Sequence, residues 1–184
     1  HLIDKATDTA EVIDGRVTAF FQFFEGIARA PILRDPTATY REKTAYLKKE
    51  AAFNERIHKM DLCDMNGIRY TDSGQTLDVS ARDFFIAASK GKNFLAEPLV
   101  SRLDGAFVIV FAVPIYDDNR TIINVLLATV EASILSHDIE DIVVGQSGYC
   151  YILGLTGTMI ASKDFARVKA MENVEKMAST DSSL

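Results

Sequence analysis

The stretch "DVSARDFF" sets one arginine beside two aromatic side chains in a chain that offers few groups for catalysis. The guanidinium of Arg82 can hold a carboxylate through parallel hydrogen bonds, and the rings of Phe84 and Phe85 can wall an apolar pocket. Arg82 can equally serve as a structural clamp that Asp78 or Asp83 neutralises, with its stem packed on the rings. The residues by themselves leave both interpretations open.

The chain contains no set of residues with the spacing of an enzyme active site. The histidines His1, His58 and His137 are scattered, and none has a second ligand at metal-binding spacing. The "GQSGY" stretch lacks the full nucleophile-elbow pattern, and it precedes a predicted strand where that motif needs a helix. Its glycines, Gly145 and Gly148, are followed by no lysine at P-loop spacing, so entry into a hairpin is favoured. We therefore predict no catalytic residue, no cofactor and no enzymatic activity.

Two acidic pairs are the remaining candidates for a metal site. Asp117 with Asp118, and Asp138 with Asp141, could bind a hard cation through carboxylate oxygens. The first pair fits a turn and the second fits the solvated face of a helix. We predict no metal site.

Composition limits the class of protein. A chain of 184 residues with 48% hydrophobic content can bury the core of one domain and the beginning of another. Its net charge of -6 argues against a nucleic-acid binder, because such proteins concentrate lysine and arginine on one face. Cys63 and Cys150 form no CxxC motif, and two buried thiols are favoured over one disulfide.

The membrane signals in the sequence are indirect. No window approaches the ~20 apolar residues of a membrane-spanning helix, so the chain as given is expected to be soluble. It begins at His1 without a methionine, which suggests an excised fragment from which a flanking membrane segment could have been removed. Neither a signal peptide nor a lipidation motif is visible.

Helical periodicity dominates the first third of the chain. Apolar residues recur at steps of three and four from Ile3 to Ile27, which predicts one long helix with a single apolar stripe. The stripe suits packing on a domain core, and a seam between two helices of a dimer is the alternative. A second helix is predicted to start near Asp35, as its cap, and to continue to about His58.

Strand patterns follow. The stretch "MDLCDMNGIRYTDSG" predicts two short antiparallel strands with tight turns at its glycines. Ser80 and Asp83 have the spacing of a helix-opening box, and Gly91 would end a helix of about ten residues. The runs "AFVIVFAVPI" and "TIINVLLATV" predict a central hairpin, in which Pro114 indicates a bulge or an unpaired edge.

The last quarter of the chain repeats the earlier order of elements, a helix followed by a hairpin. Residues 131–142 favour a helix, and "GQSGYCYILGLTGTMIAS" favours a second hairpin that turns between Gly154 and Gly157. The segment from Lys163 to Met177 is mostly polar, with weak helical periodicity, and "ASTDSSL" is typical of a loose end.

Six ordered pieces of this sequence resemble the double Cache sensor domains of bacterial chemoreceptors and related transmembrane kinases. The resemblance covers about Val17 to Ser162 and rests on the long helix, "RAPILRDPTATYREKTAYLKKE", "DMNGIRYTDSG", "DVSARDFFIAASKGKNFLAEPLVSR", "VIVFAVPIYDDNRTIINVLLATVE" and "GQSGYCYILGLTGTMIAS". It implies an α+β fold with a PAS-like antiparallel sheet flanked by helices. The expected parts are a stalk helix at residues 1–28, a membrane-distal ligand-binding module at 29–142, and the start of a smaller membrane-proximal module at 143–184.

The resemblance also implies a ligand site in the distal module. Family members that bind amino acids use an arginine for the ligand carboxylate, two aromatics as walls and an acid at the end of the last distal strand for the amino group. Arg82 matches the arginine, whereas the acidic position falls near Thr129. The candidate ligand-contact residues are Arg82, Phe84, Phe85, Leu99, Phe107, Ile109, Phe111, Tyr116 and Thr129.

The absence of an acid at Thr129 bears on the ligand. Burying an ammonium without an opposing charge costs several kcal/mol, so the sequence favours a small organic acid or a neutral stacking compound over an amino acid. The resemblance further implies an extracytoplasmic domain of a membrane receptor that can pair through its first helix. The alternatives are the input domain of a histidine kinase or diguanylate cyclase, and a protein-interaction module that binds no ligand.

Overall fold

The computed structural model describes residues 2–144 and 148–181 and divides the chain into two compact units. We call the first the sheet unit, which comprises Phe20–Ala96 and Val110–Val130. The second, the terminal unit, comprises His1–Ala19, Glu97–Ile109 and Glu131–Leu184. Each unit is built from separate stretches of chain, whereas the predicted parts are continuous. The three predicted parts, with boundaries at residues 28/29 and 142/143, therefore stay a prediction.

The helices occur in the order that the sequence pattern predicts. The long helix α1 spans Leu2–Ala28, as its apolar stripe predicts. None of the helices among the described residues is both long enough and apolar enough to cross a bilayer. The other helices are α2 (Pro31–Arg34), α3 (Tyr40–Ala52), α4 (Asp83–Ala88), α5 (Ser133–Ile139), α6 (Phe165–Lys169) and α7 (Val174–Asp181).

The predicted limits of the second helix are wrong at both ends. Thr39 is the cap of α3: its hydroxyl oxygen accepts from the backbone N–H of Glu42 at 3.3 Å, and Glu42 Oε2 accepts from the backbone N–H of Thr39 at 2.7 Å. Asp35 instead accepts from the backbone N–H of Thr37 at 2.8 Å, which forms a local turn. The helix ends at Ala52, and the next residues lead into a strand.

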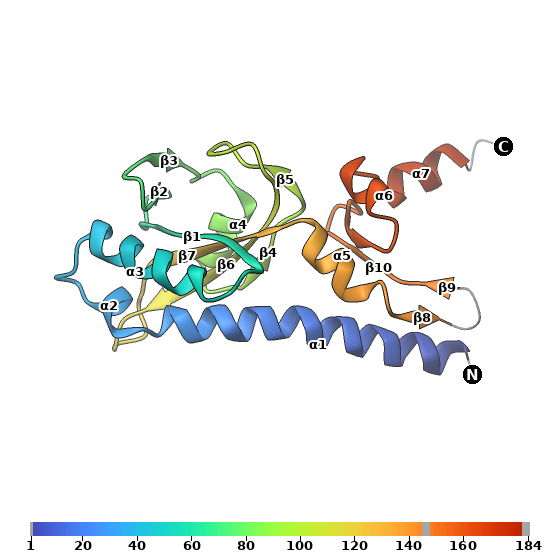
Figure 1. Ribbon diagram of the computed structural model, residues 1–184, viewed down its shortest axis with the longest axis horizontal. Coiled ribbons are helices and arrows are strands. Elements are labelled where there is room, and N and C mark those ends of the chain that lie inside the picture. Colours follow the sequence, from blue (N-terminus) through green and yellow to red (C-terminus); the bar gives the residue numbers. More distant parts are fainter. Residues whose placement is uncertain (1, 145–147, 182–184) are drawn as a thin grey trace. The chain divides into compact units, whose positions relative to one another are not determined.

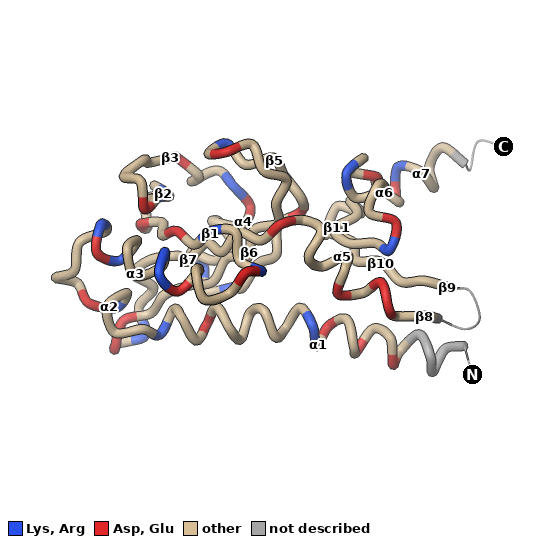
Figure 2. The backbone as a smooth tube through the Cα atoms, viewed as in Figure 1, with Lys and Arg blue, Asp and Glu red and all other residues tan. Residues whose placement is uncertain are grey.

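The sheet unit contains an antiparallel sheet with the strand order β3-β2-β1-β7-β6-β4 (Figure 1). The central pair β6 and β7 is the predicted hairpin, and in Figure 2 both strands carry almost no charge. Strand β4 pairs with β6 no further than Ala112, so Pro114 lies on a stretch without a β4 partner, where its missing N–H costs no ladder bond. The strands are β1 (Ile57–Cys63), β2 (Ile68–Tyr70), β3 (Thr76–Asp78), β4 (Phe94–Leu95), β6 (Phe107–Tyr116) and β7 (Ile122–Glu131).

One glycine in the β1–β2 turn is constrained twice. Gly67 has φ +83°, and a Cβ there would lie 2.5 Å from the Cα of Ser80. We expect Gly67→Ala to lower the free energy of unfolding by about 2–3 kcal/mol, because both backbone strain and a backbone clash result. Gly74 is the matched control: its φ is +82°, but a Cβ meets nothing within 4 Å. Urea denaturation should show a loss of about 1 kcal/mol for Gly74→Ala, and equal losses for both variants would contradict the clash.

The register of the sheet assigns its side chains to two faces. Leu62 pairs with Tyr70 and with Leu126, so these three side chains share one face. The ring of Tyr40 in α3 stacks on Tyr70 with 4.0 Å between centroids, and its hydroxyl accepts from the amide of Asn124 at 2.9 Å. Helix α3 therefore covers this face, which we call the α3 face.

The opposite face is named here the Asp61 face. It carries Asp61 opposite Leu127, Cys63 opposite Arg69, and Thr129 one pair further along β7. Because side chains alternate along a strand, all five point away from α3. This face therefore carries the polar side chains of Asp61, Arg69 and Thr129.

Aromatic rings join α1 to the sheet. The ring centroid of Phe111 in β6 lies 5.1 Å from Phe20, 5.1 Å from Phe21 and 5.4 Å from Phe24. Phe24 and Phe111 are both fully buried. This cluster accounts for the aromatic end of the helical stripe.

The terminal unit contains the predicted second hairpin. Strands β10 (Tyr151–Leu153) and β11 (Met159–Ser162) pair antiparallel and turn through Gly157, whose φ is +81°. The strands β8 (Val143–Val144) and β9 (Gly148–Tyr149) form a second short antiparallel pair. Strand β5 (Leu99–Val100) pairs with the start of β6. Gly145, predicted to enter the hairpin, lies outside the described residues. The polar segment after β11 contains α6 and the start of α7.

The two cysteines are buried free thiols, as the sequence predicts. Burial raises the pKa of Cys63 to about 12, so this thiol stays protonated and unreactive at neutral pH. Burial raises the pKa of Cys150 as well. Neither thiol is a candidate for chemistry.

Candidate functional site

Arg82 lies at the cap of α4 rather than within its first turn. The prediction that Ser80 opens this helix is wrong, because Ser80 donates from both its backbone N–H and its hydroxyl to Asp78 Oδ1, at 2.9 and 2.6 Å. That local turn uses the hydroxyl that a cap would need, so the helix begins at Asp83 and has six residues. Gly91, with φ +86°, follows three residues after its end.

The guanidinium of Arg82 has no acidic partner among the described residues. Its Cζ lies 5.5 Å from the ring centroid of Phe84, and the side chain is half-buried. Asp78 accepts from Ser80, and Asp83 accepts from the backbone N–H of Phe84 at 2.7 Å. The clamp that the sequence left open is therefore not formed, and the positive charge remains available to an anion.

The path of the chain carries α4 across the sheet. Strand β3 is at one edge and β4 at the other, so the segment between them must cross one of the two faces (Figure 1). Since α3 covers its own face, we expect the crossing to lie over the Asp61 face. Phe84 and Phe85 of α4 are 3% and 6% exposed, so both rings are buried in the sheet unit.

A buried ion pair lies on the Asp61 face. Nε and Nη2 of Arg69 donate to Asp61 Oδ2 at 2.9 and 2.5 Å, and Asp61 is completely buried. Burial raises the pKa of Asp61, and Arg69 only partly offsets that effect. Beside the pair, Asp72 binds Lys48 at 2.9 Å and Lys59 at 3.3 Å, so these two ammonium groups share one carboxylate.

Two oxygens on this face have unused hydrogen-bonding capacity. Asp61 Oδ1 and Thr129 Oγ1 are the buried side-chain oxygens without a partner in the described part of the chain. The sequence analysis singled out Thr129 but missed Asp61 and Arg69. A signal was present, because both charged residues occur in strands whose neighbours are apolar, and buried charges are rarely kept without a reason.

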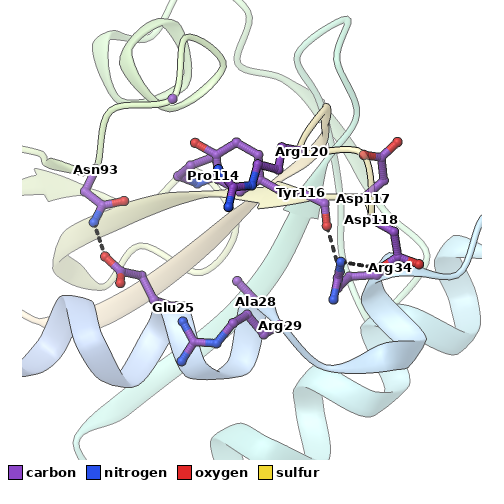
Figure 3. A pocket seen from close by; sticks show the side chains of 11 residues that line it. Glu25, Ala28, Arg29, Arg34, Asn93, Pro114, Tyr116, Asp117, Asp118 and Arg120 are labelled. Carbon is purple, nitrogen blue, oxygen red and sulfur yellow. Dashed lines mark hydrogen bonds and ion pairs between the residues drawn. The ribbon is translucent and has the colours of Figure 1, made fainter.

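A separate cavity of about 750 Å³ lies at the turn of the central hairpin (Figure 3). Arg34 links two of its walls, since Nε donates to the backbone oxygen of Tyr116 at 2.8 Å and Nη2 to Asp118 at 2.5 Å. Glu25 accepts from the amide of Asn93 across another wall. Tyr116, a predicted ligand contact, lines this cavity and is 39% exposed.

The other predicted contacts fall in different places. Phe111 belongs to the aromatic core with α1, and this packing leaves no exposed part of its ring for a ligand. Leu99, Phe107 and Ile109 belong to the terminal unit, where the ring of Phe107 lies 6.4 Å from that of Phe165. Arg82, Phe84, Phe85 and Thr129 all belong to the sheet unit.

No group of three or more potential metal ligands gathers within residues 2–144 and 148–181.

Comparisons with known proteins identify the family of the chain. A family model described as "Cache domain" matches residues 1–183. No curated protein sequence matches the chain. Many solved structures do, and three of them illustrate the range.

The ligand-binding domain of the Pseudomonas fluorescens chemoreceptor CtaA, in complex with L-serine, is 16% identical with a TM-score of 0.68, over 93% of this chain and 74% of that one. The ligand-binding domain of the Pseudomonas aeruginosa amino acid chemoreceptor PctC, in complex with GABA, is 15% identical with a TM-score of 0.65, over 95% and 79%. The extracellular domain of rpHK1S-Z16, described as a histidine kinase, is 17% identical with a TM-score of 0.63, over 83% and 66%. The chain thus spans just under two thirds to about four fifths of these domains, and at this identity the likeness shows a shared fold.

Proposed function

Because the chain belongs to the Cache domain family, we propose that it is the extracytoplasmic ligand-sensing domain of a transmembrane receptor. The ligand is a small molecule with a carboxylate, which Arg82 holds over the Asp61 face. The observation that carries this proposal is the half-buried guanidinium of Arg82, which has no counter-ion among the described residues. A charge of this kind next to buried aromatics is stabilised when an anion binds.

Signalling in such a domain requires no chemistry. The ligand binds one of two conformations more tightly, and this difference limits the signal that it can send. Helix α1 joins the sheet through the Phe111 cluster, and displacements of about 1–2 Å in a packed helix are enough to bias a two-state receptor. We propose α1 as the route of the signal and as the contact between two copies of the receptor.

Two receptor classes fit this role. The chemoreceptor domains named above favour a chemotaxis receptor, and the histidine kinase domain favours a sensor kinase. A protein-interaction module that binds no ligand is the competing function from another class. Such a module would not explain why Arg82 is half-buried with no acidic partner among the described residues.

The experiment that tests the proposal is a calorimetric titration with a panel of small organic acids and amino acids. We expect at least one carboxylate to bind, and Arg82→Ala to weaken its binding by about 10- to 100-fold, because a charge-assisted hydrogen bond is lost. Lys90→Ala is the matched control, since it removes one exposed positive charge just after the same helix and should change affinity less than about twofold. Equal losses in both variants, or no binding by any member of the panel, would refute the proposal.

A further inference from the structure

The cavity at the turn of the central hairpin lies within the sheet unit. The end of α1, the helix α2, the segment after α4 and the turn between β6 and β7 form its walls. Its volume of about 750 Å³ is in the range of small-molecule pockets, which is about 300–1,000 Å³. The described lining includes neither Arg82 nor Thr129, so a ligand in this cavity would be separate from the one proposed above.

The acidic residues of the cavity already accept hydrogen bonds from the protein. Glu25 accepts from the amide of Asn93 (Figure 3). Asp117 Oδ1 accepts from two backbone N–H groups of its own turn, at 2.9 and 2.8 Å. Asp118, whose side chain is 96% exposed, accepts from Arg34 at 2.5 Å. Each carboxylate is therefore engaged by a group of its own wall or of a neighbouring one.

Several donors of the cavity remain unused. Neither Arg29 nor Arg120 forms an ion pair with an acid in the described part of the chain. Arg29 follows Glu25 at the four-residue spacing that favours an ion pair, but Glu25 is turned to Asn93 instead. Arg34 donates through Nε and Nη2, so the N–H groups of its Nη1 remain available. The cavity thus has more positive than negative charge to offer a ligand.

Arg120 has a backbone conformation that arginine rarely adopts. Its φ is +63°, in the left-handed region where glycine and asparagine are the usual residues. Its backbone N–H donates to the carbonyl oxygen of Asp117 at 3.1 Å and closes the turn, which glycine would do without strain. Arg120 lines the cavity together with Pro114 and Tyr116 (Figure 3). Strain that is kept at such a position indicates a function for the side chain.

The unused donors select an anionic ligand. A guanidinium binds carboxylate or phosphate oxygens through paired N–H groups. The three arginines come from three elements, so a ligand with two or more anionic groups engages more of them than a single carboxylate does. Ala28 and Pro114 add apolar surface for a short carbon chain.

We propose that this cavity is a second ligand site, which binds a small polyanion with two or more carboxylate or phosphate groups. Arg29, Arg120 and the free Nη1 of Arg34 hold the anionic groups. The inference goes beyond the proposed function, because it uses another cavity and does not involve Arg82. An anion bound there also ties the end of α1 to the turn of the hairpin.

Calorimetry on the whole chain tests the site, with citrate and pyrophosphate as polyanions and acetate as the single carboxylate. Fixed ionic strength keeps the general screening of charge constant. We expect citrate or pyrophosphate to bind about tenfold or more tightly than acetate, because the polyanion makes additional charge-assisted hydrogen bonds. The comparison of the two polyanions shows whether the site prefers carboxylate or phosphate. Equal affinity for acetate and both polyanions would overturn the inference.

Three variants assign the binding to the cavity. Arg120→Gly should weaken polyanion binding by about tenfold, while the thermal midpoint of the free protein stays unchanged or rises because the strain is relieved. Glu25→Gln keeps an oxygen for Asn93 but removes a negative charge, and it should strengthen binding. Arg41→Ala is the matched control, since it removes an exposed arginine of α3 outside the cavity and should change affinity less than about twofold. Equal losses in Arg120→Gly and Arg41→Ala would overturn the inference.

Arg82→Ala separates this inference from the proposed function, and it should change polyanion affinity less than about twofold. If polyanion binding depends on Arg82 and not on Arg120, the cavity site is wrong while the proposed function stands. The same conclusion follows if no polyanion binds but another carboxylate binds through Arg82. If the polyanion binds through Arg120 while no carboxylate binds through Arg82, the proposed function fails and the cavity site stands.

Discussion

Replacing Arg69 with methionine should lower the free energy of unfolding by about 3–5 kcal/mol, because the carboxylate of Asp61 would then be buried with no partner. Arg69 supplies the two hydrogen bonds that the described chain offers to this carboxylate, and Asp61 has no contact with solvent. Methionine retains much of the volume of the arginine stem, so the loss should come from the charge. Urea denaturation of both proteins measures it.

The loss should depend on pH in a defined direction. Burial already raises the pKa of Asp61 in the folded protein, and removing Arg69 raises this pKa further. A raised acid pKa means that the folded state holds its proton more tightly, so stability is greatest below the unfolded pKa and falls as pH rises through the folded pKa. The difference between the variant and the parent should therefore be larger near pH 7 than near about pH 4.

Two controls isolate the buried charge. The double variant Arg69→Met with Asp61→Leu removes both charges, and most of the lost stability should return. Asp118→Asn breaks the exposed pair with Arg34, in which the carboxylate side chain is 96% exposed, and it should cost less than about 1 kcal/mol. If Arg69→Met lowers the free energy of unfolding no more than Asp118→Asn does, the buried pair contributes no more to stability than an exposed one.

The second large effect is expected at Phe111. Truncation to alanine should cost about 3–5 kcal/mol, since the ring is fully buried and contacts three rings of α1. Thermal or urea denaturation of the sheet unit within the whole chain measures this loss. Phe53→Ala is the matched control, because that ring is 86% exposed and its removal should change stability by less than about 0.5 kcal/mol.

This experiment also decides the role of Phe111. The sequence assigned it to the ligand site, whereas the structure buries its ring against α1. The folded fraction of Phe111→Leu, a milder change, should therefore bind a small carboxylate ligand within about threefold of the parent protein. A selective loss of affinity without a loss of stability would return Phe111 to the binding site.

Several features of the fold could be predicted because they depend on neighbouring residues alone. The three-four spacing from Ile3 to Ile27 predicted α1, and the glycine at the tip of "LGLTG" predicted the turn of the second hairpin. The limits of α3 and α4 were less accurate. In both, a short polar side chain was available to more than one local hydrogen bond, and the sequence does not rank Asp35 against Thr39 or Ser80 against Arg82.

The sequence by itself determined that the chain folds as a Cache domain, and it sets an arginine beside two aromatics on the segment predicted to contact a ligand. Such patterns record the period of a helix or strand and the order of parts, which local propensities set. Only the tertiary structure decided which residues lie beside Thr129. The β1–β7 register brings Asp61 beside Thr129 across 68 positions of chain. Contacts of this range depend on strand pairing, which no local pattern encodes.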